Sequence, residues 1–262
     1  MPRDSLIGPV HLVTPSGLGA WERCRRRYLL GQLLRLPRSD PGPGADDGNL
    51  AHDLLRHLHA TGSCHDEAHV DDVLAGHGKH TDPVARGFVE RHRRRCPPAP
   101  EAQDHERSVA RFHRGGMFMA TARLDALWRH DGFYDVRDYK TGRPGVERLA
   151  DDARARLQAW LVAARAARRG LRVRVRYEYL APEVDDDPEP FEPDDDDLSA
   201  IEAELVTVAA AMRAEREWHG VAEREVCRMC EYRSICTDSA APSEPAWPTP
   251  TNISPARHPQ SL

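Results

Sequence analysis

The hydrophobic period changes twice between residues 105 and 182, and this change limits the possible folds more than any other feature. Three segments alternate between apolar and polar side chains, as strands do: 105–114, 117–129 and 132–140. Residues 145–170 then follow a helical period that ends at Gly170, and residues 171–182 alternate again. The order β-β-β-α-β predicts an α/β core built on a mixed sheet.

The flanking regions are typical of helices. Ser16 can cap a helix that runs to about residue 35, and the turn-rich residues 37–48 follow it. Further helices are expected at 49–60, 66–76, 82–95 and 197–220. We therefore expect a helical N-terminal region before the sheet and a C-terminal segment that carries a cluster of cysteines.

We expect a single domain over residues 14–236. Its parts would be a helical insertion (48–100), a catalytic core (104–180) and an acidic loop (183–197), followed by a disordered tail (237–262). The acidic run holds ten carboxylates and no basic residue, so removing it changes the formal net charge from −5 to +5. A mildly basic body with one solvated acidic loop is compatible with a nucleic-acid partner.

Neither a signal-peptide pattern nor an apolar stretch of the roughly 18 residues that a membrane span needs is visible. We therefore expect a cytoplasmic protein with no membrane partner. The chain has six cysteines, and a reducing compartment favours ligation of a metal or a cluster over disulfide pairing.

Two carboxylates and a lysine stand at the ends of neighbouring predicted strands. If the strands form a hairpin, Asp125 and Asp138 approach each other, and Lys140 points to the same face as Asp138. Hard oxygen ligands suit Mg²⁺ or Mn²⁺, which can polarise a phosphate and acidify a bound water. Lys140 would stabilise the developing negative charge. An isolated D-x-K is nevertheless more often a solvated strand end.

Three cysteines, Cys227, Cys230 and Cys236, occur within ten residues. A tetrahedral site needs a fourth ligand, for which Cys24 is the best candidate, and the spacing does not decide between zinc and an iron–sulfur cluster. Cys64 and Cys96 stand singly in helical regions, and no role is expected for them.

Five motifs occur in an order that resembles the RecB-like nucleases of the PD-(D/E)XK superfamily in their iron–sulfur form, a group related to the AddB nuclease domain and the Cas4 nucleases of CRISPR systems. The motifs are SGLGAWERCRRRYLL, GNLAHDLL, ATARLDAL, VRDYKTG and CRMCEYRSIC. The resemblance covers about residues 14–236 and implies a restriction-endonuclease-like core.

The resemblance also implies roles for particular residues. His52, Asp125, Asp138 and the backbone carbonyl of Tyr139 would hold Mg²⁺ or Mn²⁺, with Lys140 catalytic beside the two aspartates. The four clustered cysteines would hold a [4Fe–4S] cluster: Cys24, Cys227, Cys230 and Cys236.

DNA contacts are expected from Arg123, Arg143 and Gln158. Arginine binds phosphate readily. By the resemblance, Gln158 begins a Q-x-x-x-Y motif that contacts DNA or the active site, although Val162 replaces its closing tyrosine here. The implied function is a metal-dependent exonuclease on single-stranded DNA or DNA ends, in recombination, repair or CRISPR-type processing. Because the chain has no P-loop motif, a helicase would be a separate protein. The alternative is a non-catalytic nucleic-acid-binding or scaffolding protein that keeps the fold and a zinc or iron–sulfur staple.

Overall fold

The computed structural model describes residues 10–37, 45–96, 102–142, 145–181, 184 and 186–241. The chain forms two compact units, one within Met1–Glu22 and Pro43–Glu217 and the other within Arg23–Gly42 and Trp218–Leu262. Within the described residues, no helix is both long and apolar enough to cross a membrane.

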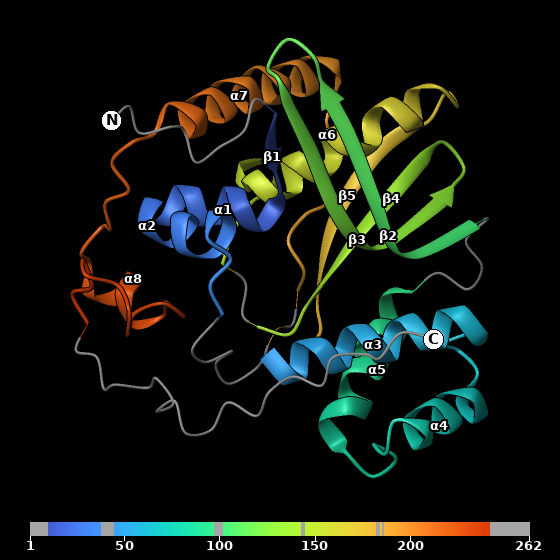
Figure 1. The fold of residues 1–262 in the computed structure, drawn as a ribbon. Helices are drawn as coiled ribbons and strands as arrows, with labels where there is room; N and C mark the ends of the chain where they lie inside the picture. The colour runs from blue at the N-terminus through green and yellow to red at the C-terminus, as the bar shows by residue number, and fades with distance from the viewer. Residues whose placement is uncertain are drawn as a thin grey trace, which may run out of the picture. The chain divides into compact units, whose positions relative to one another are not determined.

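The first unit is built on a five-stranded mixed sheet (Figure 1). Its strands are β1 (His11–Val13), β2 (Ala102–His113), β3 (Phe118–His130), β4 (Phe133–Lys140) and β5 (Arg172–Tyr179). The order is β1-β3-β4-β5, and β2 also pairs with β3. The β2–β3 and β3–β4 pairs are antiparallel, whereas β1–β3 and β4–β5 are parallel. The predicted α/β core with a mixed sheet is confirmed. The sequence does not predict β1, because three residues are too few to show alternation.

Helix α6 (Ala153–Ala167) connects the parallel strands β4 and β5, which need a crossover. It begins later than the pattern predicts, since Asp152 caps it and a 3₁₀ turn, η2 (Leu149–Asp151), precedes the cap. The helix ends as expected before Gly170, whose φ of +66° glycine adopts without strain.

Three helices form the insertion before β2: α3 (Ala45–Thr61), α4 (Glu67–Gly76) and α5 (Pro83–Arg95). Their leucines, valines and Phe88 bury a common core that also includes Ala126, Trp128 and Tyr139 of the sheet. Part of the predicted linker 37–48 is wrong, because α3 already begins at Ala45; Asp46 and Asp47 suit the positive end of the helix dipole there.

The acidic run does not end as a loop. Helix α7 (Asp195–Ala214) begins within it, and the Asp194 and Asp197 side chains form a reciprocal capping box. Upstream, Phe191 pairs with Val175 through two backbone hydrogen bonds. The loop prediction for 183–197 is therefore wrong at its end, because these carboxylates serve as helix-capping groups.

The predicted cap at Ser16 is wrong, because the helix already begins at Pro15 and the Thr14 hydroxyl accepts a hydrogen bond from the N–H of Gly17 at 2.9 Å. The predicted helix is also interrupted. Helix α1 (Pro15–Arg23) is followed by extended backbone at Cys24 (φ −167°), then by α2 (Arg25–Tyr28) and a π-helical turn, η1 (Leu29–Leu33). The second unit also contains α8 (Arg224–Arg228). Its two segments are joined by side-chain contacts: Arg27 with Glu231 at 2.9 Å, and Tyr28 stacked on Trp218 at 6.0 Å.

Candidate active site

Asp125 and Asp138 lie together where β3 and β4 separate. The antiparallel pairing reaches Ala126 and Arg137. Beyond this pair, the backbone N–H of Tyr139, two residues after Arg137, donates to the carboxylate of Asp125, one residue before Ala126, with 2.9 Å between N and Oδ2. The carboxyl groups of Asp125 and Asp138 are within hydrogen-bonding reach of each other. The predicted approach of two carboxylates at a strand end therefore exists in this structure.

A lysine and a histidine complete this group. Lys140 Nζ lies 2.6 Å from Asp138 Oδ1 and 4.7 Å from the centre of the Tyr177 ring. His52 comes from α3, and its Nδ1 lies 3.3 Å from Asp125 Oδ1. The Asp125 and Asp138 side chains keep 18% and 13% of their surface exposed, so the group is nearly buried but can be reached from solvent.

The electrostatics distinguish the two aspartates. Burial raises the pKa of Asp138 above its ordinary value; the neighbouring Lys140 opposes this rise and Asp125 adds to it. Burial would also raise the pKa of Asp125, but hydrogen bonds from His52 and the Tyr139 N–H outweigh it and hold that pKa below its ordinary value. Two adjacent carboxylates with an imidazole form a donor set that suits a hard divalent cation, which would relieve their repulsion.

The comparisons identify the family. The family model of the PD-(D/E)XK nuclease superfamily matches residues 12–237, a range that includes His52, both aspartates and Lys140. This chain belongs to the PD-(D/E)XK nuclease superfamily. It is also similar to the crystal structure of SSO0001, with 14% sequence identity, coverage of 86% of this chain and 85% of that chain, and a TM-score of 0.42. None of the curated proteins matches it.

Gln158 lies inside this PD-(D/E)XK protein, on α6, rather than on its surface. The side chain is buried, and its Nε2 lies 3.3 Å from Asp138 Oδ2. This contact fixes the amide with its nitrogen toward the carboxylate. Gln158 Oε1 is buried and has no hydrogen-bond partner among the described residues. The geometry therefore brings Gln158 to the carboxylate pair, and its expected contact with DNA stays a prediction.

Of the two arginines expected to contact DNA, the structure describes Arg123. Arg123 is exposed on β3, two residues before Asp125, and alternation along a strand puts both side chains on one face. Arg143 lies outside the described residues. Arg123 therefore lies where it could contact a phosphate near Asp125. The expected phosphate contact of Arg143 stays a prediction from the sequence.

All four cysteines of the predicted cluster belong to the second compact unit. Cys24 precedes α2, Cys227 lies in α8, and Cys230 and Cys236 follow α8. Around them, Arg26 donates to Thr237 at 2.6 Å, and the Tyr232 hydroxyl donates to the carbonyl of Leu36 at 3.3 Å. Burial raises the pKa of the Cys230 thiol, with smaller contributions from Glu231 and Cys24. The fold thus brings Cys24 into one unit with the triplet, about 200 residues later in the chain.

A further group of side chains was not expected from the sequence. His59, Cys64, His92 and Cys96 place their ligand atoms within 4.8 Å of one another. The expectation that Cys64 and Cys96 stand singly is therefore wrong, because the ends of α3 and α5 come together. The available signal was the pair of spacings His-x4-Cys and His-x3-Cys, which resemble those of zinc sites.

Proposed function

We propose that this PD-(D/E)XK protein is a metal-dependent DNA exonuclease of the RecB-like, iron–sulfur type, acting on single-stranded DNA or DNA ends. One observation carries the proposal: Asp125, Asp138, His52 and Lys140 converge where β3 and β4 separate. The superfamily match over residues 12–237 supports the nuclease class. Substrate, exonuclease mode and subfamily are our inference from the motifs in the sequence.

In this proposal, Asp125, Asp138, His52 and the carbonyl of Tyr139 hold Mg²⁺ or Mn²⁺. The bound cation would polarise the scissile phosphate and lower the pKa of an attacking water. Lys140 stabilises the negative charge that develops on the phosphate, since its ammonium already lies beside Asp138. The N–H of Tyr139 and the amide of Gln158 orient the two carboxylates by their hydrogen bonds.

Arg123 and Arg143 would bind phosphates of the DNA strand. This role for Arg123 is supported by its exposure and by its position on the same face of β3 as Asp125. Phosphate contacts carry no sequence information, which suits an enzyme that removes nucleotides progressively from any end.

The four cysteines Cys24, Cys227, Cys230 and Cys236 would hold a [4Fe–4S] cluster, with zinc as the alternative metal. Support comes from the presence of all four in one compact unit. The cluster would be structural, because it links segments that are far apart in the sequence. Residues 14–236 would then form a single nuclease domain that works in the cytoplasm with a separate helicase, recombination or CRISPR protein.

The test uses end-labelled linear and covalently closed circular single-stranded DNA of one sequence, with Mn²⁺, Mg²⁺ or EDTA. We expect the protein to degrade the linear strand with either metal, to leave the circle intact and to be inactive in EDTA. Labels at the 5′ or 3′ end reveal the polarity. Cleavage of the circle at a similar rate would contradict the exonuclease assignment. DNA that is bound but not cut under every metal would favour a non-catalytic binding protein.

A further inference from the structure

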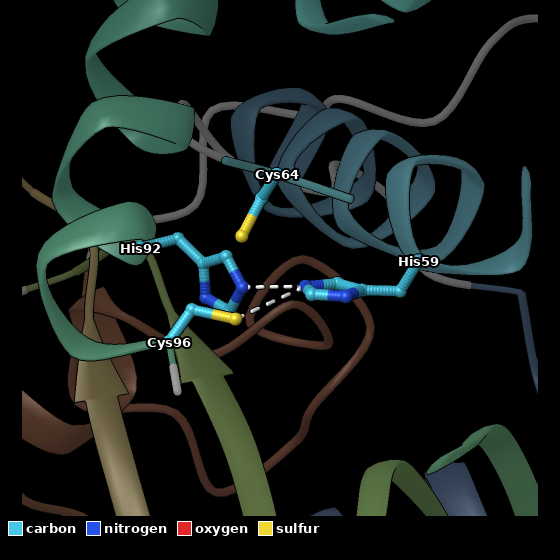
Figure 2. A group of neighbouring side chains, drawn as sticks. All are labelled: His59, Cys64, His92 and Cys96. Atoms are coloured by element: carbon cyan, nitrogen blue, oxygen red, sulfur yellow. Dashed lines mark hydrogen bonds between the residues drawn. The ribbon is translucent and has the colours of Figure 1, made fainter. Parts of the chain in front are cut away.

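The helical insertion contains a second group of potential metal ligands, separate from the carboxylate pair. Its members are two histidines and two cysteines, which Figure 2 shows turned toward one another: His59, Cys64, His92 and Cys96. Each offers one ligand atom, and these atoms all lie within 4.8 Å of one another. His59 Nε2 is 2.7 Å from His92 Nε2 and 3.8 Å from Cys96 Sγ.

These side chains come from two places, the C-terminal end of α3 and the C-terminal end of α5, and each end supplies one histidine and one cysteine. His92 and Cys96 are four residues apart at the end of α5, a spacing that puts both on one helix face. His59 lies in the last turn of α3, and Cys64 follows the end of that helix. His92 and Cys64 are completely buried, and Cys96 is 7% exposed. The group is therefore closed to solvent on most sides.

The hydrogen bonds of His92 define which ring nitrogen is available as a ligand. Its Nδ1 lies 2.6 Å from Glu178 Oε1, so this nitrogen carries a proton and donates to the carboxylate. The lone pair of the neutral ring is then on Nε2, the nitrogen that faces His59. Arg137 holds the other oxygen of Glu178 at 3.1 Å. A carboxylate behind a ligating histidine is a common arrangement in zinc sites, where it orients the ring and raises its basicity.

We propose that His59, Cys64, His92 and Cys96 form a structural zinc site. Two imidazoles and two thiolates are a tetrahedral zinc set, and four protein ligands leave no position for a water or a substrate. Two thiolates balance the charge of Zn²⁺, so the occupied site is neutral and can be buried at little electrostatic cost. Zinc entry displaces the proton between the two histidine rings and those of the thiols.

The site would fix the helix that also carries His52. His52 and His59 are seven residues, or about two turns, apart on α3 and so lie on nearly the same face. Zinc at His59 would hold the C-terminal end of α3 against α5, while His52 faces Asp125 at 3.3 Å. This last consequence depends on the proposed nuclease centre, whereas the zinc site itself does not.

The experiment measures zinc and iron per chain by elemental analysis in protein purified anaerobically without chelators. We expect about one zinc in the wild type, and its loss in the variants Cys64→Ser and Cys96→Ser. His57→Ala is the matched control, since His57 is an exposed histidine on the same helix and contacts His77 at 3.2 Å instead. Cys227→Ser separates the two sites, because it should lower iron and leave zinc unchanged.

A measurement on the wild type alone keeps the test independent of how the variants fold. Exchange of zinc for Co²⁺ in the wild type should produce the absorption of thiolate-bound tetrahedral cobalt. Wild-type protein with neither zinc nor such a cobalt spectrum would overturn the proposal. So would a disulfide between Cys64 and Cys96 in the freshly purified protein, detected by mass spectrometry of its peptides.

Discussion

Lysine is so rare in this chain that its position carries information. The only two lysines are Lys79 and Lys140, whereas arginine is abundant. Lys140 lies over Tyr177 and against Asp138 in a nearly buried site, where a compact ammonium fits and a planar guanidinium is larger. The structure thus gives a physical reason for a lysine at this position.

We therefore predict that Lys140→Arg lowers the rate of DNA cleavage about 10²-fold or more, although it keeps the charge. The matched control is Lys79→Arg, because Lys79 pairs with Asp82 in a half-exposed i,i+3 contact that either cation can make. Rates are measured on end-labelled single-stranded DNA at saturating Mn²⁺. Equal rates for the Lys140→Arg variant and the control would show that position 140 needs only a positive charge.

His11 is a buried histidine that is only 3% exposed, with its Nε2 3.0 Å from Met212 Sδ. Burial, with a smaller effect of Arg213, lowers its pKa to about 4. The unfolded chain therefore binds a proton at His11 before the folded one does, and stability is lost as the pH falls from about 6.5 to about 4. The loss from this group amounts to about 3 kcal/mol.

His11→Leu should remove this loss. From neutral pH to about pH 4, the wild type should lose about 3 kcal/mol more of its free energy of unfolding than the His11→Leu variant does. Denaturant titrations at both pH values measure it, with the exposed His80→Leu as a control that should show no such change. An equal loss of the free energy of unfolding in wild type and His11→Leu would contradict the lowered pKa of His11.

At the scale of elements, the start of α6 links helix stability to the candidate site. Asp152 Oδ1 accepts hydrogen bonds from the N–H groups of Arg154 and Ala155 at 2.8 and 2.9 Å, and from the Tyr177 hydroxyl at 2.7 Å. Tyr177 is buried, and Lys140 lies over its ring. One carboxylate oxygen thus caps the helix and satisfies a buried hydroxyl.

Asp152→Ala should therefore lower the free energy of unfolding by about 2–3 kcal/mol, through the lost cap and the unpaired hydroxyl. Asp152→Asn should cost less than about 1 kcal/mol, because its amide oxygen can accept the same bonds. Urea denaturation of the three proteins measures the difference. If both substitutions destabilise the protein equally, the negative charge matters rather than the hydrogen bonds.

Some of the helices and strands could be predicted from the sequence pattern and others could not. The strands β2–β5 follow from alternation, and α4 and α5 follow from helical period and caps. The break at Cys24 and the start of α7 inside the acidic run were not predicted. Both depend on the local backbone and capping geometry, which cannot be predicted from a hydrophobic period averaged over many residues.

At the scale of the whole molecule, the candidate active site could be predicted because its aspartates lie on two strands joined by a short turn. Their approach follows from hairpin pairing alone. The second group of ligands could not be predicted, because it depends on how three helices and their loops pack; it consists of His59, Cys64, His92 and Cys96. The approach of Gln158 to Asp138 likewise depends on how α6 packs on the sheet.

The superfamily match indicates a nuclease, and we propose that the pair Asp125 and Asp138 performs the cleavage. The most direct test is the rate of single-stranded DNA degradation as a function of Mn²⁺ concentration, in wild type and Asp138→Ala run together. Circular dichroism and iron content would verify that the variant is folded. We expect metal-dependent cleavage by wild type and a loss of at least about 10³-fold in the variant. Comparable cleavage by the folded Asp138→Ala protein would contradict it.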